Sequence, residues 1–195
     1  MSTSNYHHGD LRAALVAAAL DQLRESGPAA LALRAVARRA GVSPMAPYRH
    51  FADKEALLAA VAAQGFRLFA NRLTGASEAE AAPNAALIAQ GVAYVRFAHD
   101  EPALFGLMFG PMAPNPAGHP ALQEASEEAR GALAAAVAAA TPAMSPAARA
   151  DYAMACWATA HGLACLLGDG LACQGLDAGV IERQARNALT FLVHG

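Results

Sequence analysis

The fold of this chain is decided by residues 41–54, which read Gly41-Val42-Ser43-Pro44-Met45-Ala46-Pro47-Tyr48-Arg49-His50-Phe51-Ala52-Asp53-Lys54. Gly41 predicts the end of one helix and a tight turn, and Ser43 before Pro44 predicts the cap and first residue of a short second helix. Side chains that typically contact phosphates and base edges then follow, namely Tyr48, Arg49, His50 and Lys54. With residues 33–40 as the supporting helix, the stretch predicts a helix-turn-helix that enters the major groove of DNA.

The composition favours an all-α protein with a proper hydrophobic core. The chain has 195 residues, of which 55% are hydrophobic and 15% charged, enough for one large domain or two small ones. Alanine is the commonest residue, and runs of alternating β-branched and aromatic residues are absent. Helices are therefore the expected regular structure.

The charge of the chain is unevenly divided. Residues 1–55 carry seven basic and five acidic side chains, a net charge of +2, so the remaining residues carry −4 of the formal total of −2. A mildly basic N-terminal part on an acidic remainder favours a localised DNA contact over indiscriminate coating of nucleic acid.

No targeting or membrane segment is predicted. Residues 1–10 are polar and lack the apolar run of a secretory signal. The longest strongly apolar uncharged run, residues 153–168, is shorter than the roughly 20 residues that span a bilayer. The three cysteines, Cys156, Cys165 and Cys173, are odd in number and clustered, as expected of reduced thiols. The sequence therefore predicts a cytoplasmic protein with no membrane partner.

Capping residues and apolar periodicity predict nine helices. Asp10 is the expected N-cap of the first helix, which Gly27-Pro28 ends, and Asp53 is the expected N-cap of the fourth. Residues 74–84 and 110–120 are expected loops because small residues and prolines dominate them. Besides the short helix after Ser43, the predicted helices span residues 10–26, 33–40, 54–73, 85–98, 103–109, 120–140, 146–170 and 177–194.

Together these residues resemble the DNA-binding domain of the tetracycline-repressor (TetR) family. The resemblance covers roughly residues 10–70 and rests on three runs in order: Leu33-Arg34-Ala35-Val36-Ala37-Arg38-Arg39-Ala40-Gly41-Val42-Ser43, Tyr48-Arg49-His50-Phe51 and Lys54-Glu55-Ala56-Leu57-Leu58. It implies an all-helical homodimer with two parts. The helix-turn-helix head would span residues 1–54, with the motif at about 32–51, and residues 55–195 would bind a small effector and the partner subunit.

The resemblance also implies which residues contact DNA. Tyr48 and Lys54 correspond to the family's phosphate contacts, and Arg34 begins the supporting helix. The recognition helix would hold Ser43, Met45, Ala46, Arg49 and His50. Pro47 departs from the family, which more often has an aliphatic residue there, and a proline can shorten or kink a helix.

For each basic side chain of this region the alternative is a solvated surface. DNA contact is the preferred interpretation of Tyr48, Arg49, His50 and Lys54 because the motif fixes which face is exposed. For Arg38 and Arg39 a DNA backbone contact and a solvated face are equal alternatives, and His7 and His8 are expected in a frayed terminus.

Two stretches of the body resemble a TetR subgroup with a Trp, His and Gly signature, namely Leu104-Phe105-Gly106-Leu107-Met108-Phe109-Gly110 and Trp157-Ala158-Thr159-Ala160-His161-Gly162. Apolar pockets are lined by aromatic and methionine side chains. The candidate ligand-binding residues are Phe97, Phe105, Met108, Phe109, Trp157 and His161. Core filling is an equal alternative for each aromatic or methionine among them.

His161 lies one helical turn from both Trp157 and Cys165, so the three share a helix face. A metal or thiol sensor is one interpretation, but a zinc site needs about four ligands and Cys156 points to a different face. Buried thiols and a hydrogen-bonded core histidine are therefore preferred, and neither a metal nor a cofactor is expected. A place for His161 in a ligand cavity stays open.

The predicted helix 146–170 is apolar nearly all round, so two of its sides need cover. One side can face the core of the body and the other a partner subunit, and the last helix has the same character. An intermolecular four-helix bundle is the consistent solution. The candidate interface residues are Tyr152, Cys156, Leu163, Leu167, Ile181, Ala185 and Leu192.

We therefore expect a ligand-responsive transcriptional repressor rather than an enzyme. Two recognition helices related by the dimer two-fold would enter successive major grooves of double-stranded DNA, so the operator should be roughly palindromic. Effector binding would change the spacing of the heads as a population shift. A dimeric DNA-binding regulator without a ligand is the main alternative. An all-helical enzyme is less favoured, because the apolar body shows neither a nucleophile with a base nor paired carboxylates.

Overall fold

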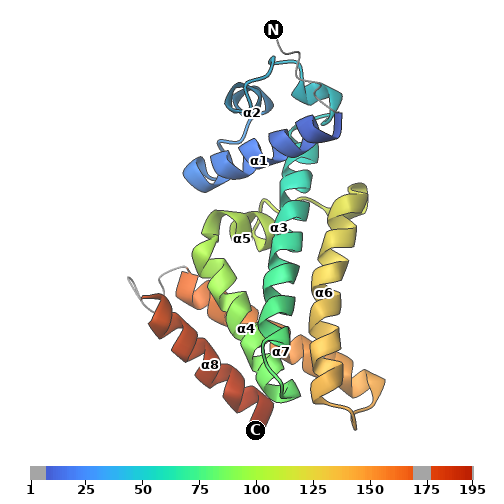
Figure 1. Ribbon diagram of the computed structural model, residues 1–195, viewed down its shortest axis with the longest axis vertical. Helices are drawn as coiled ribbons and strands as arrows, with labels where there is room; N and C mark the ends of the chain where they lie inside the picture. Colours follow the sequence, from blue (N-terminus) through green and yellow to red (C-terminus); the bar gives the residue numbers. More distant parts are fainter. Residues whose placement is uncertain (1–7, 169–176, 195) are drawn as a thin grey trace. The chain divides into compact units, whose positions relative to one another are not determined.

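The computed structural model describes residues 8–168 and 177–194, and within these ranges all regular structure is helical (Figure 1). The elements are α1 (His8–Ser26), α2 (Leu33–Arg39), η1 (Pro47–Arg49), α3 (Lys54–Glu78), α4 (Pro83–Asp100), α5 (Pro102–Phe109), η2 (Pro116–Gly118), α6 (Pro120–Ala140), α7 (Pro146–Gly168) and α8 (Ala178–His194), where η1 and η2 are single 3-10 turns. The predicted all-α fold is confirmed. No described helix is long and apolar enough to cross a membrane. His7 and Cys173 lie outside the described residues.

The helix ends differ from the predicted ones at several places. α1 begins at His8, so Asp10 lies inside the helix and is not its N-cap. α3 continues past the predicted end at Leu73 to Glu78, because small polar residues weaken a helix without ending it. The chain then restarts as α4 at Pro83, which occupies the first turn, where a missing N–H costs little.

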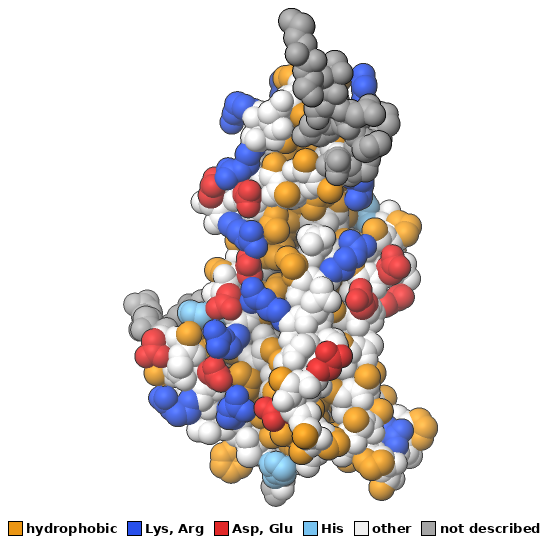
Figure 2. Space-filling model, viewed as in Figure 1, with side chains coloured by type: hydrophobic (Ala, Val, Ile, Leu, Met, Phe, Trp, Pro, Cys, Tyr) orange, Lys and Arg blue, Asp and Glu red, His pale blue; other side chains and the backbone are white. Residues whose placement is uncertain are grey.

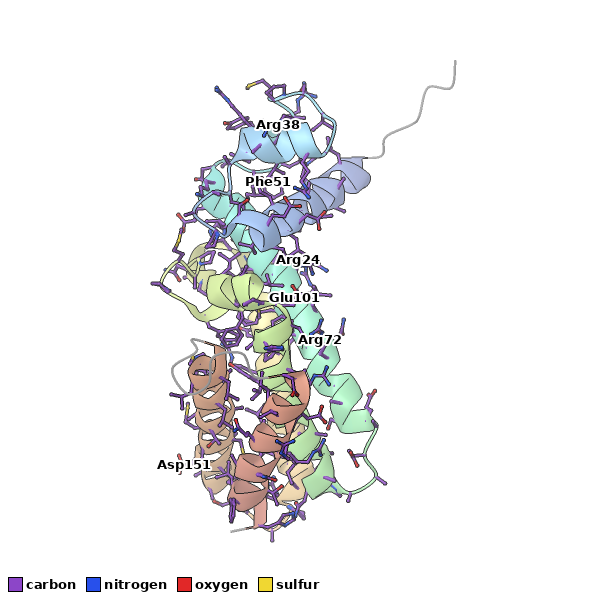
Figure 3. All side chains as sticks on the ribbon, turned by 90° about the vertical axis from the view of Figure 1, so that its left-hand side faces the viewer. Arg24, Arg38, Phe51, Arg72, Glu101 and Asp151 are labelled. Carbon is purple, nitrogen blue, oxygen red and sulfur yellow. The ribbon has the colours of Figure 1, made fainter. Side chains whose placement is uncertain are left out.

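The chain divides into two compact units, and the first comprises residues 1–65 and 103–124. At the centre of this unit, the side chain of Phe51 is 2% exposed. Figure 3 shows Phe51 between α1 and α2. The guanidinium of Arg12 lies 5.4 Å from the centre of the Phe51 ring, a distance typical of a cation–π contact. Other fully buried side chains of this unit are Leu15, Leu23, Leu31, Val36, Leu57, Val61, Leu104, Leu107 and Leu122. The predicted head, residues 1–54, lies within this first unit.

The second unit, residues 66–102 and 125–195, is organised around α4. Both α7 and α8 pack along α4. Gly91 of α4 permits a close approach of α8, since a Cβ added there would lie 2.7 Å from Cδ1 of Leu189. One core cluster joins α4 to α8 through Ile88, Val92, Val95, Ile181, Ala185 and Leu189. A second joins α4, α6 and α7 through Leu87, Ala136, Val137 and Cys156.

Candidate nucleic-acid interface

The turn after α2 is fixed by two backbone hydrogen bonds. Gly41 takes φ of +69°, a conformation that glycine adopts without steric cost. Its N–H donates to the carbonyl of Arg38 at 3.2 Å, and the N–H of Val42 donates to the carbonyl of Ala37 at 3.0 Å. This pair of bonds is the Schellman arrangement that ends many helices. The direction in which the chain leaves α2 is therefore defined.

The recognition segment is shorter than predicted, because only Pro47–Arg49 form a 3-10 turn. Ala46 is the N-cap residue of this turn and no side chain caps it, so the prediction of a Ser43 cap is wrong. Two prolines within four residues remove the backbone donors that an α-helix would need here. The N–H of Ala46 bonds instead to the carbonyl of Ser43 at 3.0 Å.

Pro47 anchors this segment to the core. It occupies the first position of η1, where its missing N–H leaves no partner unmatched. The ring is buried, and the Pro47 carbonyl accepts hydrogen bonds from the N–H groups of His50 and Phe51, both at 2.9 Å. The proline therefore shortens the recognition segment without leaving a broken helix.

The structure exposes most of the side chains that the sequence assigned to DNA contact. Met45 is 66% exposed and Tyr48 is 42% exposed, and Arg34, Ser43 and Arg49 are also exposed. The more enclosed members of the predicted set are Ala46, His50 and Lys54, which are half-buried. On the face shown in Figure 2, basic and acidic side chains are interspersed and form no broad patch of one sign, as expected where DNA contact is local.

Two basic side chains near this surface are held by their own chain. The ammonium of Lys54 donates to the carbonyl of Ala29 at 3.0 Å, which fixes its position and leaves two of its donors for another acceptor. Arg39 makes a two-pronged contact with Glu25, one arm of which is 2.7 Å long. The hydrogen bond from Arg39 holds the pKa of Glu25 below its ordinary value. Arg38, labelled on α2 in Figure 3, is exposed.

Asp53 caps the helix that follows the recognition segment. Its carboxylate accepts a hydrogen bond of 2.8 Å from the N–H of Ala56, so the prediction of an Asp53 N-cap is confirmed. Because α3 begins at Lys54, this cap fixes the helix start directly beside the predicted phosphate contact of Lys54.

In the second unit, three polar aromatic side chains form a hydrogen-bonded chain. The indole N–H of Trp157 donates to the hydroxyl oxygen of Tyr94 at 3.3 Å, and that hydroxyl lies 2.8 Å from Nδ1 of His161. Nε2 of His161 lies 3.6 Å from the Sγ of Cys165. Burial raises the pKa of Tyr94 well above its ordinary value. The hydroxyl is therefore neutral, and when it donates to Nδ1 the ring proton of neutral His161 lies on Nε2.

The interior beside this chain is aromatic. The ring of Phe69 meets Tyr94 edge-on at 4.8 Å and Phe97 at 5.1 Å between ring centres. Arg72 covers Phe97, with its guanidinium 5.2 Å from the ring centre and 3.2 Å from a carboxylate oxygen of Asp100. Figure 3 shows Arg72 and Glu101, which are also paired, at 3.9 Å.

Gln90 is a buried polar side chain that the sequence analysis missed. It is 3% exposed and lies one helical turn before Tyr94 on α4. Its amide N–H donates to the carbonyl of Ala132 at 3.2 Å, whereas its Oε1 is buried without a hydrogen-bond partner. A buried acceptor without a donor is costly, which makes Gln90 a candidate for contact with a ligand. Gln90 and Tyr94 lie one turn apart in the predicted helix 85–98, and this spacing of two polar residues was the available signal.

The six predicted ligand-binding residues fall in both compact units. Trp157 and His161 belong to the Tyr94 chain, and Phe97 lies fully buried beside it in the second unit. The other three belong to α5 in the first unit. There Phe105 and Phe109 pack with ring centres 4.9 Å apart, and Met108 is buried against the backbone of Gly65.

The predicted dimer residues occupy buried positions at Cys156, Ile181 and Ala185 and half-buried positions at Tyr152, Leu163, Leu167 and Leu192. Ile181, Ala185, Leu163 and Leu167 pack in the cluster between α4 and α8, and Tyr152, Cys156 and Leu192 pack in the cluster with α6. These helices are apolar on more than one face, and α4 packs against both of them. The large apolar side chains that stay exposed on α7 and α8 are Met154, Trp157, Leu166 and Phe191.

The described cysteines lie in different surroundings. Cys156 is buried, and burial raises the pKa of its thiol. Cys165 is half-buried beside His161. Within residues 8–168 and 177–194, no group of three or more His, Cys, Asp and Glu side chains could hold a metal ion.

A helix-turn-helix with an exposed recognition segment, together with a body of helices, defines a DNA-binding regulator. Comparison with known families identifies the family to which this regulator belongs. Residues 15–61 match the family model of bacterial regulatory proteins of the tetR family, and residues 87–191 match that of the tetracyclin repressor-like C-terminal domain. The second match alone spans more than half of the chain. The protein therefore belongs to the TetR family of transcriptional regulators, which are not enzymes.

Solved structures show the same fold. A protein of unknown function from Rhodococcus sp. RHA1 is 34% identical, with a TM-score of 0.78 over 96% of this chain and 97% of that chain. A TetR/AcrR family regulator from Thermobifida fusca YX-ER1 is 21% identical, with a TM-score of 0.68 over 95% and 98%. FadR from Bacillus subtilis, solved in complex with stearoyl-CoA, is 15% identical, with a TM-score of 0.72 over 94% and 98%. No curated protein matches the chain.

Proposed function

We propose that this protein is a homodimeric repressor that binds a roughly palindromic operator and releases it when a small molecule binds in the body. The exposed surface of residues 43–49 carries the DNA-binding part of the proposal. Tyr48 and Arg49 project there from a turn anchored by the buried Pro47. Arg34 supplies a cation from the supporting helix, and Lys54 supplies another from the start of α3. Such a repressor acts at the chromosome, which in a bacterium lies in the cytoplasm.

The DNA-binding part is tested with an operator selected from a random pool of duplexes. Replacing both proposed phosphate contacts, Tyr48→Ala with Lys54→Ala, should weaken binding at least about tenfold, since hydrogen bonds to charged groups contribute about 1.5–3 kcal/mol each. The matched control is Arg130→Ala, the loss of an exposed cation on α6. A gel-shift titration in which the double variant and the control bind equally would refute the assignment.

The dimer is proposed to form through the outer faces of α7 and α8. The core of the subunit leaves Met154, Trp157, Leu166 and Phe191 exposed on these two helices. Exposed apolar side chains on neighbouring helices are typical of interfaces, and an isologous contact between two such helix pairs gives a four-helix bundle. Light scattering should give the mass of a dimer, and Leu166→Asp with Phe191→Asp should shift it to that of a monomer. A monomeric wild-type protein at micromolar concentration would overturn this part.

The effector is proposed to bind beside Tyr94 and Gln90 and to be uncharged and largely apolar. The buried polar side chains of the described residues are Gln90 and Ser126, with no Asp, Glu, Lys or Arg among them. A charged ligand would therefore lose its hydration without gaining a buried counter-charge. The unpartnered Oε1 of Gln90 can accept a hydrogen bond, so the effector should carry a hydroxyl or N–H donor. The FadR structure with stearoyl-CoA is an example of this fold with a bound small molecule.

A thermal-shift screen of uncharged apolar compounds tests the effector. A true effector should raise the melting temperature by mass action and lower operator affinity. Gln90→Leu removes the unpartnered oxygen and should fold at least as stably as the wild type, yet lose the response. A screen without any stabiliser would favour the alternative, a dimeric DNA-binding regulator that takes no ligand.

We also propose that the chain belongs to the TetR subgroup with a Trp, His and Gly signature in the C-terminal domain. The contacts of Trp157 and His161 with the same Tyr94 hydroxyl support this assignment. Gly162 directly follows His161 in the sequence.

A further inference from the structure

Met45 is an exposed apolar side chain on a surface otherwise suited to polar partners. It is 66% exposed, the highest value of any large hydrophobic residue within residues 11–65. Arg34, Ser43 and Arg49 of the same predicted surface are exposed polar or charged residues. A single exposed methionine is ordinary on a protein surface, but this one lies in the segment that the proposed function places against base edges.

The local backbone keeps Met45 outside the core. Pro47 occupies the buried position of this segment, and Phe51 at 2% exposure closes the interior behind it. Hydrogen bonds from the N–H of Ala46 to the carbonyl of Ser43, at 3.0 Å, and from that of Arg49 to the carbonyl of Ala46, at 3.2 Å, hold the chain on both sides of Met45. The side chain therefore projects from a defined point.

The floor of the major groove offers one prominent apolar group, the C5-methyl of thymine. A thioether is polarizable and adapts its three rotatable bonds to an irregular partner, so Met45 suits a contact with that methyl. The neighbours of Met45 are less able to make it, because Ala46 is short and half-buried and Pro47 is buried. Arg49 is a donor and suits guanine O6 and N7 instead.

We propose that Met45 reads the methyl group of a thymine in each operator half-site, which makes it a specificity-determining residue. This inference rests on the proposed DNA-binding function. It predicts one T·A pair per half-site, facing residues 43–46, at which thymine is preferred over cytosine and over uracil.

The test replaces each thymine of the selected operator, one position at a time, by deoxyuridine, which removes only the methyl group and keeps base pairing. At one position the wild-type protein should bind about fourfold more weakly for one substituted half-site and about 15-fold for both, because a buried methyl contributes about 0.8 kcal/mol. Met45→Ala should bind the thymine and deoxyuridine duplexes equally. Met112→Ala, a change at another exposed methionine of the same unit, should keep the full wild-type preference.

The possible outcomes separate this inference from the function on which it rests. If no sequence is selected from the random pool, the DNA-binding function itself fails. If an operator is selected but every deoxyuridine substitution leaves wild-type affinity within about twofold, only the reading by Met45 is overturned. An equal deoxyuridine effect on wild type and Met45→Ala would also overturn it, since the methyl would then be read by another residue. The wild-type measurement needs no variant, so it holds whether or not Met45→Ala folds.

Discussion

The recognition segment of the head and the paired helices α7 and α8 of the body both expose large apolar side chains, but in different surroundings. Met45 and Tyr48 are exposed on a short segment that contains one 3-10 turn, with Arg34 and Arg49 exposed on the same surface. On α7 and α8, Met154, Trp157, Leu166 and Phe191 are spread along two long helices. Apolar groups among cations suit a nucleic acid, whereas apolar groups exposed on packed helices suit a second copy of the chain.

The two regions also differ in what holds them. The recognition segment is anchored by buried Pro47 and by a few backbone hydrogen bonds. The helix α8 instead fills a continuous interior with Ile181, Ala185 and Leu189 against α4. Substitutions in the head should therefore change binding more than stability, and substitutions on the inner face of the body should do the reverse.

The largest expected effect on stability is that of Leu189→Ala. Leu189 is 3% exposed and reaches to the backbone of Gly91, so its truncation leaves a cavity and should lower the free energy of unfolding by about 2–5 kcal/mol. Phe191→Ala, on the same helix but 80% exposed, should change the intrinsic stability of the subunit by less than about 0.5 kcal/mol.

Chemical denaturation at several protein concentrations separates the two effects. The loss caused by Leu189→Ala should be the same at every concentration. A loss caused by Phe191→Ala should appear only as a changed concentration dependence, because it would act through dimerisation. Equal, concentration-independent losses for both variants would contradict the assignment of an inner and an outer face to α8.

The head could be predicted from the sequence because its signals are local. Gly41, Asp53 and the polar run that starts at Tyr48 lie within a dozen or so residues, and the structure confirms the turn, the cap and the exposure of Tyr48 and Arg49. The length of the recognition helix was harder to predict than these local features. Ser43 and Pro44 alone indicate a helix start, but Pro47 takes over that position and limits the segment to three residues.

The faces of the body helices could not be predicted because apolar periodicity does not choose between two apolar sides. α4 decides which side of α7 and α8 is buried, and its contacts join residues far apart in the sequence. The hydrogen bond between Tyr94 and His161 spans 67 positions, so only the fold brings the pair together. His161 was identified as a hydrogen-bonded histidine, but its partner was not.

A smaller effect is expected at the cap of α3, which depends on the side chain of Asp53. Asp53→Ala removes the acceptor of the Ala56 N–H and should lower the free energy of unfolding by about 1 kcal/mol. Asp53→Asn is the matched control, because asparagine caps helices about as well as aspartate. Thermal unfolding of the three proteins measures this, and an equal loss for both variants would show that the negative charge, not the capping bond, is what stabilises the helix start.

The smallest expected effect is that of the exposed ion pair between Glu25 and Arg39, and its sign depends on pH. Because the hydrogen bond from Arg39 lowers the pKa of Glu25 in the folded protein, the pair should stabilise the fold above the unfolded pKa of this carboxyl. That stabilisation should be lost as the pH falls through the folded pKa. Glu25→Gln should therefore destabilise the head slightly near neutral pH and not at all in acid, and added salt should shrink the difference because both side chains are well exposed. Urea unfolding of wild type and Glu25→Gln at both pH values measures this, with Glu80→Gln as the control at another exposed carboxylate. A difference that persists in acid would mean that Glu25 stabilises the head through packing or hydrogen bonding that does not need its charge.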